Sequence, residues 1–147
     1  MSNQLAAAIA TAVVGGLIAL QAPINSGLGK ATGTLPAAAI SFTVGTVLLV
    51  GLVLVSGEIG GVSGIAHVKA QYLIGGLLGA AYVTTVLVTV RTLGAGGVTA
   101  ATVAGQLTAA VIIDRLGILG LESRPITLVR LLGVVLLFVG TVLVIRT

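Results

Sequence analysis

The sequence contains no cysteine and no tryptophan, only three acidic residues and a single histidine. The absence of cysteine excludes disulfide scaffolds, thiolate metal centres and cysteine nucleophiles. Charged residues make up 7% of the 147 positions, whereas a soluble domain carries about 25%. A chain with so few charges cannot cover a water-exposed surface with polar groups. These absences exclude an ordinary soluble enzyme, a disordered chain and a secreted disulfide-rich domain.

Seven basic residues against three acidic residues give a formal net charge of +4, but the basic residues form no patch in the sequence. They occur singly along the chain, at positions 30, 69, 91, 115, 124, 130 and 146. Nucleic-acid-binding domains gather their cations on one face or stripe, so we expect no nucleic-acid partner. Isolated cations at this spacing are typical of the flanks of membrane spans.

Hydrophobic residues make up 57% of the chain and are arranged in five long runs. A helix needs about 20 apolar residues to cross a bilayer core of about 30 Å. The first run begins near Leu5 and continues through Leu20 or, in a longer alternative, past Pro23. The others cover about residues 35–55, 72–90, 94–113 and 126–145. The sequence therefore predicts an all-α membrane protein, with residues 1–147 forming a single domain of five transmembrane helices in the lipid bilayer.

Polar or glycine-rich segments separate these runs. We expect connections at residues 25–34, 56–69, 91–97 and 114–125. Thr34 and Pro36 are typical of a helix start, so the second helix is expected to begin there.

The five runs differ in composition. The second and fifth are rich in leucine and valine, whereas the first, third and fourth are rich in alanine, glycine and threonine. Small residues allow close helix approach in lipid, so we predict that these three helices form an inner bundle. Gly75, Gly79 and Gly105, together with Pro23 in the first run, are candidate packing or hinge positions, although for the glycines alone plain structural packing is the preferred interpretation.

Neutral polar side chains interrupt the apolar runs. Gln21 and Asn25 are four residues apart and share one helix face, and Pro23 between them weakens the local backbone hydrogen bonding. An unpartnered amide in hydrocarbon costs several kcal/mol, so such groups must face one another, a ligand or water. We predict that they line a substrate pathway, with interhelical hydrogen bonding as the alternative: Gln21, Asn25, Ser41, Tyr82 and Gln106.

Ionisable residues lie near the ends of the predicted helices. Asp114 ends the fourth run and Arg130 lies about one turn inside the fifth, so the short connection places both at one membrane face. We expect a structural ion pair, or an Arg130 that extends to the headgroups alone, with proton coupling as the alternative. Glu58, Glu122 and His67 lie in connections without metal-ligand spacing. No enzymatic activity, metal or cofactor is therefore expected.

The basic residues are distributed almost equally between the two faces of a five-span topology. One face carries Lys69, Arg115, Arg124 and, if it is counted, Arg130, and the other carries Lys30, Arg91 and Arg146. A fixed orientation normally requires a clear excess on one side. We therefore predict that both orientations are inserted and pair as an antiparallel homodimer, a ten-helix bundle resembling the inverted repeats of secondary transporters. A fixed-orientation chain with a separate partner is the weaker alternative.

Five segments together form a distinctive set: PINSGLG (23–29), SFTVG (41–45), GGLLGAAYV (75–83), RTLGAGG (91–97) and GQLTAAVIIDRLG (105–117). They resemble the YdcZ-type inner-membrane proteins of the drug/metabolite transporter superfamily, from about Leu5 to the end of the chain. The resemblance implies a dual-topology half-transporter that exports small metabolites or drugs across the bacterial inner membrane. It also implies functional positions at Asn25, Ser41, Tyr82, Gln106 and Asp114.

The expected function is alternating-access transport of a small solute by an antiparallel homodimer. An uncharged pathway suits a neutral or zwitterionic solute, and the chain lacks the mid-helix glutamate that small multidrug-resistance relatives use for cations. A dual-topology channel and a non-transporting membrane scaffold remain the alternatives.

Overall fold

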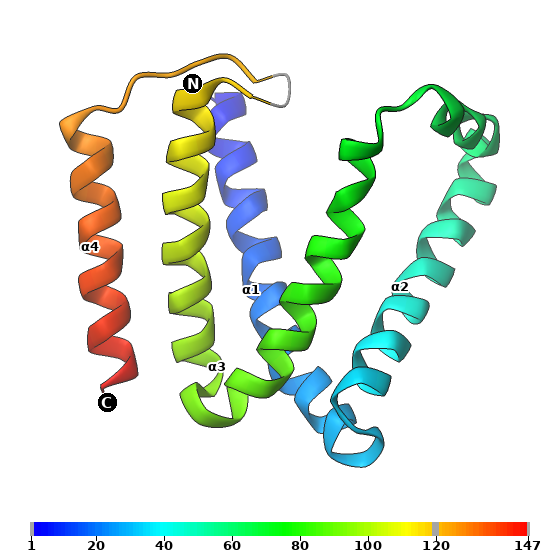
Figure 1. Ribbon diagram of the computed structural model, residues 1–147, viewed down its shortest axis with the longest axis horizontal. Helices are drawn as coiled ribbons and strands as arrows, with labels where there is room; N and C mark the ends of the chain where they lie inside the picture. The colour runs from blue at the N-terminus through cyan, green and yellow to red at the C-terminus, as the bar shows by residue number, and fades with distance from the viewer. Residues whose placement is uncertain (1, 119–120, 147) are drawn as a thin grey trace. The chain divides into compact units, whose positions relative to one another are not determined.

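The computed structural model describes residues 2–118 and 121–146, and every regular element among them is a helix. In chain order these are α1 (Ser2–Thr32), α2 (Thr34–Ser56), the 3-10 helices η1 (Glu58–His67) and η2 (Ala70–Leu73), α3 (Ile74–Leu116) and α4 (Leu128–Ile145) (Figure 1). By length and composition, four candidate membrane spans lie within the described residues: Gln4–Thr32, Thr34–Ser56, Ala70–Leu116 and Leu128–Ile145. The prediction of an all-α membrane protein is therefore confirmed.

Helix α1 is longer than the sequence predicts. The connection expected at residues 25–34 is wrong, because α1 continues through Pro23 and Asn25 to Thr32. Gly33 alone separates it from α2, which begins at Thr34 as expected, and the φ angle of 91° at Gly33 lies in a region that glycine adopts without steric cost. Ser26 and Gly29 are buried, so tertiary packing overrides the weak helix propensity of this glycine-rich segment.

Helix α3 has a single break inside it. It contains 43 residues, and Gly94 has φ 68° and ψ 171°, well outside the helical region. The connection expected at residues 91–97 is thus reduced to this one glycine. The segments on either side, residues 74–93 and 95–116, each have the length of about 20 residues that a bilayer core requires.

The other two connections also differ in detail from expectation. Residues 56–69 are mostly ordered as the 3-10 helix η1 rather than as an irregular loop. At the end of α3 the helix continues to Leu116, and α4 begins only at Leu128, after Thr127 as its N-terminal cap.

The chain divides into two compact units, unit 1 (Met1–Arg91) and unit 2 (Thr92–Thr147). The core of unit 1 consists of two small residues on α2 and two larger residues on α3: Ala37, Ala38, Val83 and Leu87. In unit 2, Val98, Ala104 and Thr141 are buried. The alanines allow α2 to approach α3 closely, as small residues do in membrane helix packing.

Large aliphatic side chains cover the outside of the helices. Examples are Val13 (62% exposed), Leu77 (71%), Val55 (90%) and Leu128 (85%). Soluble monomers rarely expose contiguous apolar patches larger than a few hundred Å². This surface therefore requires lipid or another protein around it, in agreement with a membrane fold.

Candidate functional site

Two open grooves lie along α1 and α2 in unit 1. The first has a volume of about 230 Å³ and is lined by Gln21, Ser41, Phe42, Gly45, Thr46 and Leu49. The second has a volume of about 400 Å³ and is lined by Val14, Leu17, Ile18, Gln21, Ile24, Asn25 and Ser41. Because Gln21 and Ser41 line both, we treat them as one continuous feature, the α1–α2 grooves.

The polar side chains of the grooves are positioned by helix geometry. Gln21 and Asn25 lie one turn apart, and α1 remains helical through Pro23, so both side chains occupy the same face. Asn25 is only 6% exposed, Gln21 is exposed and Ser41 is half-buried. These three are the predicted pathway residues that the structure brings together.

None of these three side chains has a hydrogen-bond partner among residues 2–118 and 121–146. Other hydroxyls in the same helices are satisfied locally. The Thr11 hydroxyl donates to the Ala7 carbonyl oxygen at 2.8 Å, and the Thr43 hydroxyl donates to the Ala39 carbonyl oxygen at 2.9 Å. The polar side chains of the α1–α2 grooves therefore have free hydrogen-bonding capacity within the described residues, as do Ser26, Tyr82 and Thr84 elsewhere in unit 1.

The other two predicted pathway residues lie outside these grooves. Tyr82 is half-buried and packs against the core of unit 1. Gln106 belongs to unit 2, where it is exposed on the second segment of α3.

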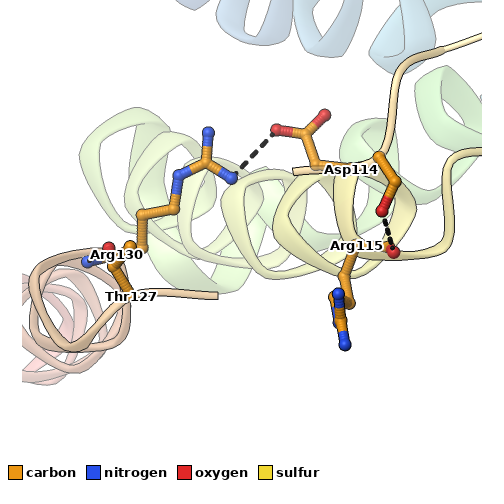
Figure 2. Close-up of polar contacts among 5 residues, drawn as sticks. Asp114, Arg115, Thr127 and Arg130 are labelled. Atoms are coloured by element: carbon orange, nitrogen blue, oxygen red, sulfur yellow. Dashed lines mark hydrogen bonds and ion pairs between the residues drawn. The ribbon is translucent and has the colours of Figure 1, made fainter. Parts of the chain in front are cut away.

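Asp114 and Arg130 face each other in unit 2 (Figure 2). Arg130 Nη1 lies 3.3 Å from Asp114 Oδ2, and the two side chains are 31% and 33% exposed. The Nη1 atom has no hydrogen bond within the described chain, so the contact is an ion pair without hydrogen-bond geometry. At such exposure an ion pair contributes about 0.2–1 kcal/mol.

The segment after α3 is fixed to the end of that helix. The Arg124 amide donates to the Asp114 carbonyl oxygen at 2.8 Å, and the Ser123 hydroxyl donates to the Arg115 carbonyl oxygen at 2.9 Å. Gly117 makes the reversal possible, because its φ angle is 59° and a Cβ there would lie 3.1 Å from Ser123 Cβ. These contacts satisfy carbonyl groups that a helix end otherwise leaves unpaired.

The glycine and proline positions predicted for packing or hinge motion have different surroundings. A Cβ at Gly79 would lie 3.4 Å from Phe42 Cζ, so this glycine is in contact with α2. No side chain lies within 4 Å of a Cβ placed at Gly75 or Gly105, and Pro23 is exposed within α1. Only Gly79 of these four therefore packs against another helix within the described chain.

Two packing features are not predicted by the sequence. A Cβ at Gly29 would lie 3.2 Å from both Leu87 Cδ2 and Arg91 Nη2, so this glycine allows α1 and α3 to approach closely. The Thr141 hydroxyl of α4 lies 3.0 Å from the Ala100 carbonyl oxygen of α3. The glycine content of residues 25–34 is a signal for close helix packing as well as for a loop.

Acidic residues and histidine do not gather anywhere in the described chain. Among residues 2–118 and 121–146, no three side chains of the metal-ligating types lie close enough to hold an ion. The polar chemistry available at the α1–α2 grooves is thus that of neutral amides and hydroxyls, which bind by hydrogen bonding.

Comparison with known proteins identifies one family. The family model described as "Putative inner membrane exporter, YdcZ" matches residues 6–143. No curated protein and no solved structure matches the chain. The matched range includes the α1–α2 grooves, the break at Gly94 and the Asp114–Arg130 ion pair, and it covers nearly the whole chain. The resemblance seen in the sequence is therefore confirmed, and the chain belongs to the YdcZ family.

Proposed function

We propose that the chain is one half of a secondary transporter that exports a small polar solute across the bacterial inner membrane. Two copies of opposite orientation form a ten-helix bundle, and the solute passes by alternating access without being chemically changed. The observation that carries this proposal is the set of unpartnered polar side chains in the α1–α2 grooves, formed by Gln21, Asn25 and Ser41. The family's description as inner membrane exporters supports the transport role.

The energetics of the grooves favour a ligand. An amide in hydrocarbon without a hydrogen bond costs several kcal/mol, and Asn25 has no hydrogen-bond partner among the described residues. The residue is 6% exposed, but its amide atoms are not fully buried and are open to the groove that the residue lines. Internal hydrogen bonding, the alternative for these polar groups, is absent for all three side chains among the described residues. The hydrogen bonds of these side chains must therefore come from solute, water or the second copy. A carrier requires a site that solute and water occupy in turn.

A five-span topology is part of the proposal. Gly94 divides α3 into segments of spanning length, and its φ angle of 68° interrupts the helix there. A single straight helix of 43 residues extends about 65 Å at 1.5 Å per residue, about twice the thickness of a bilayer core. Two spans joined at Gly94 fit that thickness, and an odd number of spans lets inverted copies share one architecture.

The positions of the cations within each unit support dual orientation. In unit 1, Lys30 lies in the last turn of α1, and the Arg91 guanidinium lies beside Gly29 at the same end. In unit 2, the Arg124 amide is bonded at the end of α3 where Asp114 pairs with Arg130. Each unit thus has its own cations at a helix end, which supports the nearly equal charge count of the five-span topology.

The solute proposed is neutral overall and rich in hydrogen-bonding groups. No charged side chain occurs among the residues that line the two grooves, so a multivalent ion would lose hydration without compensation. The groove volume of about 400 Å³ falls within the range of about 300–1,000 Å³ that is usual for small-molecule sites. Sugars, polyols and neutral or zwitterionic amino acids have the matching chemistry.

The direct test is solute counterflow in proteoliposomes containing the purified protein. Labelled sugars, polyols and neutral amino acids are each offered from outside, with and without the unlabelled compound inside. A carrier predicts uptake that is stimulated by the trans solute. Ser41→Ala should reduce it, whereas the matched control Thr43→Ala should not, because the Thr43 hydroxyl is bonded to its own helix. Flux without trans-stimulation would identify a channel, and no flux for any solute a scaffold.

The dimer is tested separately by labelling. The sequence has no cysteine, so a cysteine placed after Arg146 is a unique site for a membrane-impermeant maleimide. Dual orientation predicts that about half of the copies react in intact cells and the rest only after permeabilisation. Reaction of all copies, or of none, before permeabilisation would contradict the antiparallel homodimer.

A further inference from the structure

The connection between α2 and α3 contains an unusually regular segment. Helix η1 has 10 residues, whereas 3-10 helices longer than 3–4 residues are uncommon. Its sequence, EIGGVSGIAH, has a large apolar residue at every third position. A 3-10 helix has 3.0 residues per turn, so residues three apart lie directly above one another. On an α-helix, with 3.6 residues per turn, the same spacing would drift by about 60° at each step.

The apolar residues consequently form one straight stripe, which we call the η1 stripe: Ile59, Val62 and Ile65. They are 55%, 57% and 57% exposed, so no part of the described chain covers them. The positions between them are small or polar. Three of these are Gly60, Gly61 and Gly64, which have open space around a Cβ, and a fourth is Ser63, whose hydroxyl donates to the Gly60 carbonyl oxygen at 2.7 Å.

We propose that η1 lies in the plane of the membrane interface, with the η1 stripe in the acyl boundary and the glycine side toward water. Its position in the chain supports the bilayer as the partner. Gly57 ends α2, and η2 leads directly into α3, so η1 lies where two candidate spans leave the membrane core (Figure 1). At about 2.0 Å per residue the segment is about 20 Å long, too short to cross a core of about 30 Å.

The flanking side chains are of the kinds found at headgroup level. Glu58 precedes the η1 stripe, and His67 and Lys69 follow it, all exposed. Tyr72 in η2 is 53% exposed, and tyrosine is enriched at membrane–water interfaces. The last turn of α2, immediately before η1 in the chain, adds a further exposed apolar side chain, the 90%-exposed Val55. Amphipathic helices with this arrangement lie with the apolar face about 5–10 Å below the headgroup boundary.

The test is a single-cysteine scan of η1 in the cysteine-free chain. Spin labels are placed by Ile59→Cys, Val62→Cys and Ile65→Cys, and by the matched controls Gly61→Cys and Gly64→Cys, in protein reconstituted into liposomes. For each label we compare the accessibility to oxygen with the accessibility to a water-soluble nickel reagent. We expect the ratio of oxygen to nickel accessibility to be several-fold higher for the stripe labels than for the control labels. The accessibility should repeat every three residues.

Two results would overturn the proposal. Equal nickel accessibility at all five positions would mean that η1 is a solvated loop, and exclusion of both reagents from the stripe would mean that protein covers it. Reaction of the same five cysteines with a water-soluble maleimide gives an independent readout, expected to be fast at positions 61 and 64 and slow at 59, 62 and 65. Neither readout depends on transport, so this proposal is tested independently of the proposed function.

Discussion

Unit 1 and unit 2 each contain a buried polar side chain, Asn25 and Thr141, and the two side chains differ in their hydrogen bonds. In unit 2, the Thr141 hydroxyl lies 3.0 Å from the Ala100 carbonyl oxygen on α3 and 2.8 Å from the Leu137 carbonyl oxygen on its own helix. In unit 1, Asn25 is buried but has no partner in the described chain. The 9%-exposed threonine and the 6%-exposed asparagine are similar in burial, so the difference lies in their partners and not in their depth.

This contrast separates structural polar groups from candidate binding groups. A hydrogen bond between α3 and α4 stabilises unit 2 whether or not a solute is present. The amides and the hydroxyl of the α1–α2 grooves gain their hydrogen bonds only from something outside the described chain. Gln106 is an exception in unit 2, because it is exposed without a hydrogen bond among the described residues.

The largest effect on transport is expected when the Asn25 amide is replaced by an apolar side chain of similar size. Asn25→Leu should lower counterflow roughly tenfold or more, since losing one hydrogen bond to a buried solute costs about 1–3 kcal/mol. Its thermal midpoint should stay the same or rise, because an unpartnered amide is removed from an apolar setting. Transport in proteoliposomes and unfolding in detergent are measured on the same preparation.

Thr141→Val is the matched control for this change. It should leave counterflow unaltered and lower stability by about 0.6 kcal/mol, the average for an interhelical hydrogen bond in a membrane protein. Should Asn25→Leu instead destabilise the protein and leave transport intact, Asn25 would be a structural residue and the contrast between the units would fail.

An intermediate effect, on stability, is expected at Gly117, where the chain reverses direction after α3. Gly117→Ala should destabilise the protein by about 1–2 kcal/mol, the usual cost of a left-handed conformation for a residue with a Cβ. Contact with Ser123, whose backbone nitrogen would lie 3.2 Å from the new Cβ, adds to that cost. Gly133→Ala in α4 has open space around it and should not destabilise. Equal thermal midpoints for the two variants would mean that the reversal contributes nothing to stability.

Part of this arrangement could be predicted from sequence, and the limits have physical causes. The hydropathy of the sequence predicts the apolar helices, and the separation of four residues between Gln21 and Asn25 correctly places both on one helix face. The sequence could not reveal that α1 continues to Thr32, because glycine favours both loops and close helix contacts. Only the packing of Gly29 against Leu87 distinguishes the two. Nor could the sequence show that Tyr82 belongs to the core of unit 1, since amphipathic side chains suit a core and a pathway equally.

The smallest effect is expected from the ion pair in unit 2. Asp114→Asn should lower stability by at most about 1 kcal/mol, because the pair is partly exposed to solvent. Counterflow should be unchanged if the pair only holds the start of α4 against the end of α3. Arg130→Gln and the double variant complete a cycle whose coupling energy measures the pair directly. If Asp114→Asn abolished uptake driven by a proton gradient but left counterflow intact, Asp114 would couple transport to protons, and unit 2 would have a functional polar group of its own.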